Sequence, residues 1–267
     1  MKARVGIVGV PGRMGLELLK ALNSSDGGQL AAAIARPGSP VVGKDATQLA
    51  GLLPSGIAVS DDLPAALPGL DVVIDFSRAG SVAGTTDACV AAGVALMVGT
   101  TGLDAATQAR LDAAAARIPV LVAPNTSLAL NVLLELVQRA ARALPAAYDI
   151  EIVEAHHRHK VDAPSGTALA LGEAAATGRG VKLERPPALT GSSPGPRGIG
   201  IGFAVVRGGD VVGEHDVRFL GTGEQLRLGH VATDRAIFAR GAVLASLWLA
   251  KQPPGRYRMA DFLFPPQ

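Results

Sequence analysis

The sequence is short of cysteine and of aromatic residues, and each shortage limits what the chain can be. One cysteine, Cys89, stands among 267 residues, so no disulfide can form within the chain. A chain without disulfides suits a reducing compartment, and we expect a cytoplasmic protein. Cys89 lies in the apolar stretch DACVAAG and is interpreted as a small buried side chain. Aromatic residues make up 3% of the chain and hydrophobic residues 48%, so the core is expected to consist mainly of Ala, Val, Leu and Ile.

Long apolar runs and long basic runs are also absent. No stretch reaches the ~20 uninterrupted apolar residues that a membrane-spanning helix requires, so no association with a membrane is expected. The opening MKARVGIVG is predicted to be a strand leading into a glycine-rich turn, not a signal peptide. The formal net charge is +2, and no run of Lys or Arg accompanies it. Nucleic acid is therefore not an expected partner.

Short apolar segments alternate with helical segments through the first half of the chain. The predicted strands are RVGIVGV, QLAAAIA, LDVVIDFS, VALMVGTT and PVLVAPN. Segments with helical spacing lie between several of them, namely PGRMGLELLKALNSS, SVAGTTDACVAAG and LDAATQARLDAAAARI. This alternation predicts a doubly wound parallel sheet covered by helices on both faces.

The pattern changes after Asn125. SLALNVLLELVQRAARALPA is predicted to be an amphipathic helix, DIEIVEAHH a strand, and a further helix begins near Thr167. RPPALTGSSPGPRGIG is predicted to be a loop. Residues 202–233 alternate like an antiparallel meander with turns at 208–209 and 221–223, and DRAIFARGAVLASLWLAKQ is predicted to be the final helix.

The first predicted strand ends in GVPGRMG, where Gly9, Gly12 and Gly15 recur at every third position. Glycines let the backbone turn sharply and approach a pyrophosphate, and the next helix directs its N–H groups at the anion. A strand before and a helix after are the context of a dinucleotide-binding unit. Because Pro11 replaces the middle glycine of the usual motif, a plain structural turn remains the alternative. Arg13 is interpreted as a phosphate contact or as a solvated residue.

The second predicted strand ends in AIARPG, which carries Ala35 and Arg36 where an acid usually holds the ribose 2′-hydroxyl of NAD. An arginine suits the 2′-phosphate of NADP instead. We therefore expect NADPH to bind better than NADH, with a surface arginine as the alternative. GTTG (Gly99–Gly102) and APNTS (Ala123–Ser127) also end strands, where ligands bind in such folds, although either can be a tight turn.

Three of the five histidines lie in EAHHRHKVDAPSGTALALGEA, residues 154–174. Metal binding is the weaker interpretation, because strand alternation separates His156 from His157 and Lys160 adds a positive charge. Anion binding is favoured by a helix start capped by Ser165 or a neighbour, whose N–H groups suit a carboxylate. Proton transfer is favoured because histidine and lysine can act as general acids. A solvated basic loop is the alternative.

Six segments in order closely resemble the dihydrodipicolinate reductases of bacterial lysine and diaminopimelate synthesis. They are GVPGRMG, GTTG, PNTSLALN, EAHHRHKVDAPSGTALALGEA, VVRGGDVVGEH and FARGAVLASLWL, and the resemblance covers essentially the whole chain. It implies an NAD(P)H-dependent reduction of a cyclic dicarboxylic imine to tetrahydrodipicolinate with loss of water.

The resemblance also implies the roles of individual residues. His156 matches the proton donor and acceptor, Lys160 the second proton donor, and His157 a substrate contact. Gly166 and Thr167 match the residues that hold a substrate carboxylate. The residues that match cofactor contacts are Gly9, Val10, Pro11, Gly12, Arg13, Met14, Arg36, Gly99, Thr100, Thr101, Ala123, Pro124, Asn125 and Thr126.

The fold class implied is α/β, with a Rossmann-like dinucleotide-binding domain and an α+β domain for substrate binding and oligomerisation that has an open mixed sheet. The domains are expected at 1–126 plus 236–267 and at 127–235, in a homotetramer with the C-terminal helix returning to the first domain. The histidine cluster is expected to face the nicotinamide in the cleft between the domains.

The chain departs from the family at several positions. Thr126 stands where an aromatic is common, Leu128–Leu130 replaces a glycine-containing stretch, and Arg197 receives no role. A different dehydrogenase of similar architecture and a non-catalytic nucleotide sensor are the alternatives, and neither accounts for the histidine cluster.

Overall fold

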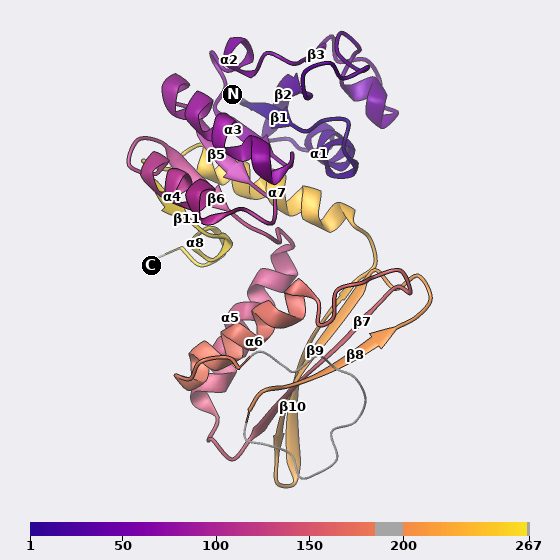
Figure 1. Ribbon diagram of the computed structural model, residues 1–267, viewed down its shortest axis with the longest axis vertical. Helices are drawn as coiled ribbons and strands as arrows, with labels where there is room; N and C mark the ends of the chain where they lie inside the picture. Colours follow the sequence, from indigo (N-terminus) through magenta and orange to yellow (C-terminus); the bar gives the residue numbers. More distant parts are fainter. Residues whose placement is uncertain (185–199, 266–267) are drawn as a thin grey trace. The chain divides into compact units, whose positions relative to one another are not determined.

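The computed structural model describes residues 1–184 and 200–265, and the chain divides into two compact units (Figure 1). The first unit comprises Met1–Leu128 and Ala236–Gln267, and the second Ala129–Arg235. The C-terminal helix therefore belongs to the first unit. The loop predicted at 185–200 lies outside the described residues except for Gly200. Within the described ranges no helix combines the length and apolarity needed to cross a membrane.

The first unit is built on a parallel sheet of seven strands in the order β11-β6-β5-β4-β1-β2-β3. The chain builds outward from β1 through β2 to β3, and then continues on the other side of β1 with β4. The predicted doubly wound sheet is confirmed, and its topological switch point lies between β1 and β4. The strands are β1 (Ala3–Val8), β2 (Gly28–Ile34), β3 (Val59–Ser60), β4 (Val72–Asp75), β5 (Ala95–Val98), β6 (Pro119–Val122) and β11 (Gly255–Tyr257).

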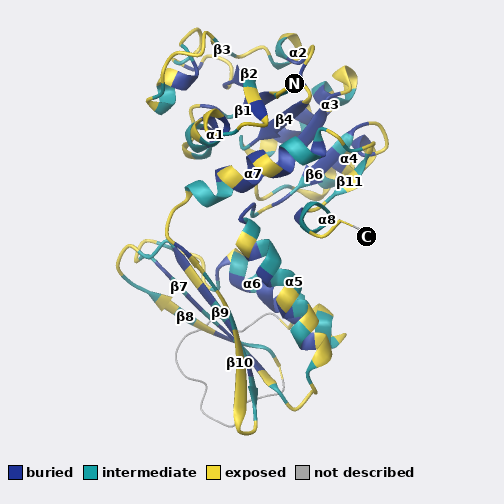
Figure 2. Ribbon diagram, turned by 180° about the vertical axis from the view of Figure 1, so that it is seen from behind, coloured by how far each residue is buried: buried dark blue, intermediate teal, exposed yellow. Residues whose placement is uncertain are grey.

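Helices cover both faces of this sheet, and the central strands are buried along their length (Figure 2). Successive strand residues serve opposite faces: Ile74 joins the core under α1 and α7, whereas Val73 joins the core under α3 and α4. Full burial of such a side chain stabilises the fold by about 1.5–3 kcal/mol. The helices are α1 (Arg13–Asn23), α3 (Ala79–Ala92), α4 (Ala105–Ala114) and α7 (Ala236–Leu249).

Cys89 of α3 is completely buried in the second of these cores, as predicted. Burial and the neighbouring charge of Asp75 raise the pKa of its thiol to about 12. The thiol therefore remains protonated and takes no part in nucleophilic chemistry.

Several short elements of the first unit were not predicted. They are η1 (Thr47–Ala50), α2 (Leu63–Ala66), β3, β11 and α8 (Met259–Leu263). The prediction that α7 is the final element is wrong, because β11 extends the sheet beside β6 and α8 follows it. Elements of two to five residues are too short to show a helical or strand period.

The second unit is a four-stranded sheet in the order β10-β9-β7-β8 with two helices on one face. The predicted antiparallel meander is wrong for its first strand. β8 pairs with β7 in parallel and does not pair with β9, so the sheet is mixed, as the expected fold class states. The elements are α5 (Leu128–Ala143), β7 (Asp149–His156), α6 (Gly166–Arg179), β8 (Gly202–Arg207), β9 (Gly213–Gly221) and β10 (Glu224–Ala232).

The predicted turn at 208–209 has different hydrogen-bond partners from those of a hairpin. The N–H of Gly208 donates to the carbonyl of His156 (3.0 Å), and the N–H of Arg158 donates to the carbonyl of Gly209 (3.2 Å). The N–H of His157 donates to the carbonyl of Val211 (2.8 Å). The segment after β8 therefore pairs with the chain that leaves β7, and β7 lies between β8 and β9.

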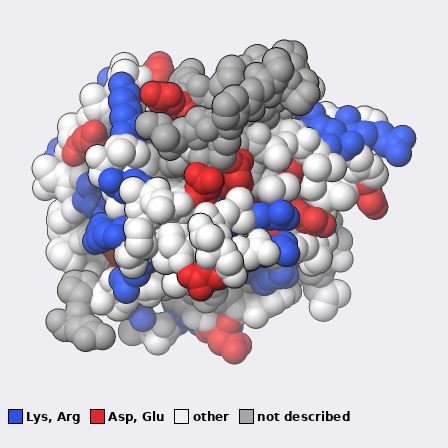
Figure 3. Space-filling view, turned by 90° about the horizontal axis from the view of Figure 1, so that it is seen from below, with Lys and Arg blue, Asp and Glu red and all other residues white. Residues whose placement is uncertain are grey.

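One face of the mixed sheet packs on α5 and α6, with Ile152, Val217 and Phe219 completely buried. The strand residues between these point to the other face, where Arg218 and Arg227 both pair with Asp216. Basic and acidic side chains are interspersed on the side of the molecule seen in Figure 3. No helix among the described residues covers this second face.

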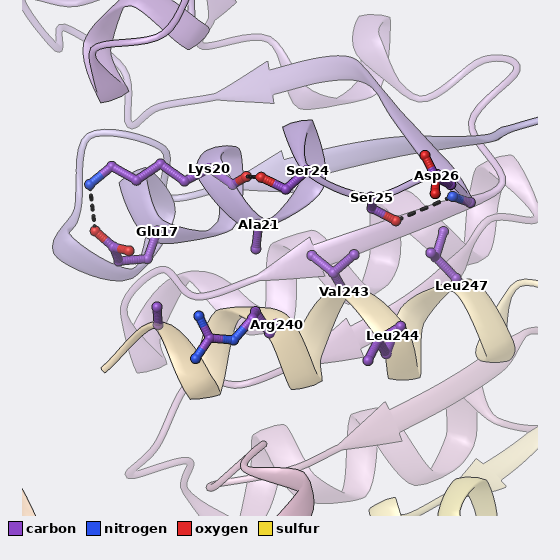
Figure 4. A pocket seen from close by; sticks show the side chains of 12 residues that line it. Glu17, Lys20, Ala21, Ser24, Ser25, Asp26, Arg240, Val243, Leu244 and Leu247 are labelled. Carbon is purple, nitrogen blue, oxygen red and sulfur yellow. Dashed lines mark hydrogen bonds and ion pairs between the residues drawn. The ribbon is translucent and has the colours of Figure 1, made fainter. Parts of the chain in front are cut away.

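A hollow of about 680 Å³ lies between α1 and α7 of the first unit (Figure 4). Val243 and Leu247 of α7 point toward α1, and the ion pair between Lys20 and Glu17 lies at its rim. None of the predicted cofactor residues lines this hollow, so it is separate from the glycine-rich turn.

Gly15 permits the close approach of α1 to the turn that precedes it, and this gives a first prediction. A Cβ at Gly15 would lie 2.4 Å from the carbonyl oxygen of Gly9 and 2.5 Å from that of Val10. Both obstacles are backbone atoms, so we expect Gly15→Ala to lower the free energy of unfolding by roughly 1–3 kcal/mol. Urea denaturation measures this change.

Gly84 of α3 is the matched control, because a Cβ there would meet no atom within 4 Å. Gly84→Ala is expected to leave stability unchanged or raise it by up to about 1 kcal/mol, since alanine favours a helix interior. Equal effects of the two substitutions would contradict the proposed close approach.

Candidate functional site

The glycine-rich turn joins the end of β1 to the start of α1. Gly9 has φ +93°, a conformation that favours glycine, and its N–H donates to the carbonyl of Ile34 (2.9 Å). The N–H of Gly12 donates to the carbonyl of Gly9 (2.9 Å), and α1 begins at Arg13 without a side-chain cap. The positive end of α1 is therefore available to an anion.

The turn lies directly beside the end of β4. A Cβ at Gly9 would lie 2.9 Å from the carbonyl oxygen of Phe76, so only glycine fits without a shift. Because β1 and β4 flank the switch point of the sheet, this contact places the turn where nucleotides bind in doubly wound folds.

Asp75 fixes the ends of β4 and β5 to each other. Its side chain is completely buried, and its Oδ1 accepts hydrogen bonds from the N–H of Ser77 (2.8 Å) and the hydroxyl of Thr100 (3.3 Å). The ring of Phe76 occupies the space in which Gly99 would carry a Cβ. Asp75 lies at the end of the predicted strand LDVVIDFS, and it was not predicted as a site residue.

Thr126 follows β6 and is tied to α7. Its hydroxyl donates to the carbonyl of Phe238 (2.6 Å), and its own carbonyl oxygen occupies the space where Gly241 would carry a Cβ. The N–H of Ser127 donates to the side-chain oxygen of Asn125 (2.9 Å). The Thr126 hydroxyl therefore serves the internal structure of the first unit.

The predicted cofactor residues of the first unit all follow the carboxyl ends of parallel strands. Gly9–Met14 follow β1, Arg36 follows β2, Gly99–Thr101 follow β5, and Ala123–Thr126 follow β6. The carboxyl ends of parallel strands meet at one edge of the sheet, so the fold brings the four groups to the same edge. Arg36 is exposed there, and so is Arg13.

The second unit contains a buried ionic network around Glu154 of β7. Only 1% of Glu154 is exposed, and Arg207 of β8 grips its carboxylate with two hydrogen bonds of 2.7 Å. Burial raises the pKa of Glu154, but hydrogen bonds from Arg207, His156 and the N–H of Ser165 more than offset that effect and leave it below its ordinary value. Glu154 is therefore an ionised carboxylate at neutral pH.

His156 lies two residues after Glu154 on the same strand face. Its Nδ1 lies 2.6 Å from Oε2 of Glu154. The ring of His215 on β9 meets the His156 ring edge to face, with 5.0 Å between the centroids. Nε2 of His215 is hydrogen-bonded to the hydroxyl of Ser165 at 3.0 Å. Glu154, Arg207 and His215 were not predicted as site residues.

The loop after β7 carries the remaining predicted side chains. Lys160 donates to Oδ1 of Asp162 (2.8 Å), and this hydrogen bond holds the pKa of Asp162 below its ordinary value. Burial and the charge of Arg235 lower the pKa of His157. His159 is exposed, and Asp162 is exposed apart from its pairing with Lys160.

Ser165 caps α6, as predicted. Its hydroxyl accepts from the N–H of Ala168 (3.1 Å). Gly166, the first residue of the helix, is exposed, and a Cβ there would meet nothing within 4 Å. The start of α6 therefore faces open space beside the Glu154 network, to which Ser165 is directly bonded (3.0 Å). Thr167 is half-buried in the first turn.

A signal for the missed residues exists in the sequence. The spacing of two between Glu154 and His156 puts both on one face of a strand. Arg207 and His215 lie within VVRGGDVVGEH, which contributed to the family resemblance. Their partners depend on strand pairings that the sequence did not predict. No group of three or more His, Cys, Asp or Glu side chains is placed to hold a metal ion in the described ranges.

Comparison with known proteins places this geometry in a family. Residues 3–126 match the family model described as "Dihydrodipicolinate reductase, N-terminus", and residues 129–263 match "Dihydrodipicolinate reductase, C-terminus". The chain is 50% identical over 265 residues to the 4-hydroxy-tetrahydrodipicolinate reductase of Alkalilimnicola ehrlichii, covering 98% of this chain and 99% of the relative. It is 49% identical over 268 residues to that of Thiobacillus denitrificans, with the same coverage.

Among solved structures, the fold resembles a dipicolinate-bound dihydrodipicolinate reductase from Paenisporosarcina sp. TG-14. The TM-score is 0.79 at 24% sequence identity, covering 99% of this chain and 100% of the other. The expected fold class is confirmed by this likeness.

His215 gives a prediction about pH. Burial and the neighbouring charge of His156 lower the pKa of His215 to about 4, from an ordinary value of 6.5. The unfolded chain therefore binds a proton between these two values that the folded chain does not, and stability falls as the pH is lowered through that range. Between pH 6.5 and about 4, we expect the free energy of unfolding of wild type to fall relative to that of His215→Gln by at most about 1.4 kcal/mol for each pH unit.

Urea unfolding at pH 7, 6, 5 and 4.5, followed by circular dichroism, measures this difference. His159→Gln is the control, because His159 is exposed, and it should unfold in parallel with wild type at every pH. A constant difference between wild type and His215→Gln across the series would show that His215 titrates normally.

Proposed function

The chain belongs to the dihydrodipicolinate reductase family, and from that premise we propose which of its residues perform the reaction. It is an NAD(P)H-dependent oxidoreductase that reduces 4-hydroxy-tetrahydrodipicolinate to tetrahydrodipicolinate in lysine and diaminopimelate biosynthesis. One observation carries the assignment of residues: the buried pair of Glu154 and His156 is bonded directly to the start of α6.

The first unit holds the cofactor, which supplies the hydride when it is bound. We assign its pyrophosphate to Gly9–Met14, because this turn ends at an uncapped helix N-terminus beside the switch point of the sheet. The nicotinamide and its ribose are assigned to Gly99–Thr101 and Ala123–Thr126, which follow neighbouring strands. Arg36 receives the 2′-phosphate, so NADPH is the preferred cofactor and NADH the weaker one.

The second unit holds the dicarboxylate substrate. One carboxylate is assigned to Gly166 and Thr167, where the positive end of α6 opens onto unoccupied space. His157 contacts the same substrate from the loop after β7. The solved reductase of similar fold is described as dipicolinate bound, and dipicolinate is also a cyclic dicarboxylate.

His156 and Lys160 handle protons during the reduction. A conjugated C=C–C=N that accepts a hydride develops negative charge, which a general acid relieves by donating a proton. His156 is the proton donor and acceptor, since its ring is held by an anionic neighbour. Lys160 is the second proton donor, and its ammonium group is partly buried. Water forms from the substrate's own hydroxyl and a proton of the neighbouring ring carbon, which leaves a conjugated C=C–C=N. The hydride and one donated proton then add to this conjugated system, so the net reaction takes up one hydride and one proton.

The second unit also provides the surface for assembly. We assign a homotetramer to its mixed sheet, because one face of that sheet carries no helix among the described residues. The enzyme is assigned to the cytoplasm on its single buried cysteine.

His156→Ala tests the proton role. We expect kcat to fall roughly 10²–10⁴-fold while the affinity for NADPH stays within about twofold, because His156 belongs to the unit that does not hold the cofactor. The assay follows NADPH oxidation with substrate formed from pyruvate and aspartate semialdehyde. His159→Ala, on the exposed side of the same loop, is the control and should keep wild-type kcat. An unchanged kcat in His156→Ala would remove this residue from the mechanism.

Arg36→Ala tests cofactor preference. We expect KM for NADPH to rise about tenfold, the cost of one charge-assisted contact to phosphate. KM for NADH should hardly change, since NADH lacks the 2′-phosphate, and NADH therefore serves as the internal control in the same variant. A wild-type kcat/KM that favours NADH tenfold or more would refute the assignment.

A further inference from the structure

Glu154 is the most completely hydrogen-bonded carboxylate near the site, although it transfers no proton itself in the proposed reaction. We propose that Glu154 is a positioning residue that fixes the tautomer and orientation of His156 and ties that ring to the start of α6. The proposal rests on the proposed role of His156 in proton transfer.

Both oxygens of Glu154 are fully engaged. Oε1 accepts from Nη2 of Arg207 (2.7 Å) and from the N–H of Ser165 (3.0 Å). Oε2 accepts from Nη1 of Arg207 (2.7 Å) and lies 2.6 Å from Nδ1 of His156. With the residue 1% exposed, four hydrogen bonds from three residues, His156, Arg207 and the α6 cap Ser165, replace water around the carboxylate. The carboxylate therefore has one position.

This arrangement determines where His156 carries its proton. An ionised carboxylate can only accept hydrogen bonds, and the bidentate grip of Arg207 keeps Glu154 ionised. Nδ1 of His156 must then be the donor. In the neutral ring Nε2 is left as the acceptor, and in the imidazolium it carries the proton that can be given away.

The surroundings of Nε2 agree with a transferable proton. In the described part of the chain no hydrogen bond joins Nε2 of His156 to another group. A Cβ at Gly213 would lie only 3.1 Å from Nε2, so the glycine leaves room beside this atom. The ring of His215 meets the His156 ring edge to face and stays uncharged at neutral pH, because burial lowers the pKa of His215 to about 4.

The same carboxylate connects the imidazole to the carboxylate-binding helix. Ser165 donates its N–H to Glu154 and caps α6 with its hydroxyl. Arg207 donates in addition to the carbonyl of Asp162 (2.8 Å), in the loop that leads to Ser165. Any movement of Glu154 would displace the proton-transferring ring and the helix start together.

Charged and titratable groups face His156 from every element packed against it. Glu154 lies on its own strand, Arg207 on β8 and His215 on β9, and His157 and Lys160 follow in the loop. Glu154 is the one anion among these groups in the described residues.

Glu154→Gln keeps the size of the side chain and removes its charge. We expect kcat to fall roughly 10²-fold or more, with KM for NADPH within twofold of wild type. A purely structural role would lower the amount of active enzyme and leave kcat per active site unchanged. Glu173→Gln, on the exposed face of α6, is the matched control and should match wild type.

A double-mutant cycle separates this inference from the proposed function. If Glu154 acts through His156, adding Glu154→Gln to His156→Ala should lower kcat by no more than about threefold further. A further loss as large as in the single variant would overturn the positioning role and leave His156 in place. A wild-type kcat in Glu154→Gln, together with a lowered kcat in His156→Ala, would also overturn the positioning role and leave the role of His156 in place. Wild-type kcat in His156→Ala would overturn both.

The wild-type protein offers a test that does not depend on a folded variant. In ¹⁵N-histidine-labelled enzyme at pH 8, the ring of His156 should give the signals of the tautomer protonated at Nδ1. The assignment comes from the signals lost in His156→Ala. A ring protonated at Nε2 with bare Nδ1 would overturn the proposal.

Discussion

The second unit depends on one ion pair, the two-pronged contact between Arg207 and the buried carboxylate of Glu154. A buried ion pair is a weak source of net stability, because desolvating both charges offsets much of their attraction. What it provides is a defined geometry: three elements, β7, β8 and the start of α6, converge on one carboxylate. Loss of Arg207 would leave the buried carboxylate of Glu154 without its counter-charge, which costs about 3–5 kcal/mol. The proton transfer that we propose for His156 relies on this fixed carboxylate.

The first unit, to which we assign the cofactor, offers an anion no buried charged side chain at the start of α1. At the start of α1 the partial positive charge that attracts an anion comes from backbone N–H groups instead of side chains. The close contacts of Gly9 and Gly15 with neighbouring backbone make that edge rigid before any ligand arrives. Asp75 extends the same rigidity to β5 by holding Ser77 and Thr100. A preformed site spends less binding free energy on ordering itself.

Features with a local cause were accessible from the sequence. The parallel strands, the glycine-rich turn and the Ser165 cap each follow from residues within a few positions of one another, and the structure confirms them. The position of β7 between β8 and β9 and the bond between Glu154 and Arg207 join residues about 50 positions apart, and no single-sequence period encodes them. The family resemblance predicted His156 and its neighbours because it works residue by residue. It could not name the side chains that hold His156 in place.

The bond between Thr126 and Phe238 has a consequence for how this chain is assembled. Thr126 precedes the point at which the chain leaves the first unit, and Phe238 follows the point at which it returns. The segments that leave and re-enter the first unit are therefore neighbours. The hydroxyl of Thr126 donates to the carbonyl of Phe238, and the carbonyl oxygen of Thr126 packs against Gly241, which has no side chain. The second unit is therefore an insertion at one position of the first unit, because the two chain segments that flank it are hydrogen-bonded to each other. An insertion of that kind leaves the parallel sheet of the first unit uninterrupted, so the second unit can diverge in sequence while the first keeps its fold.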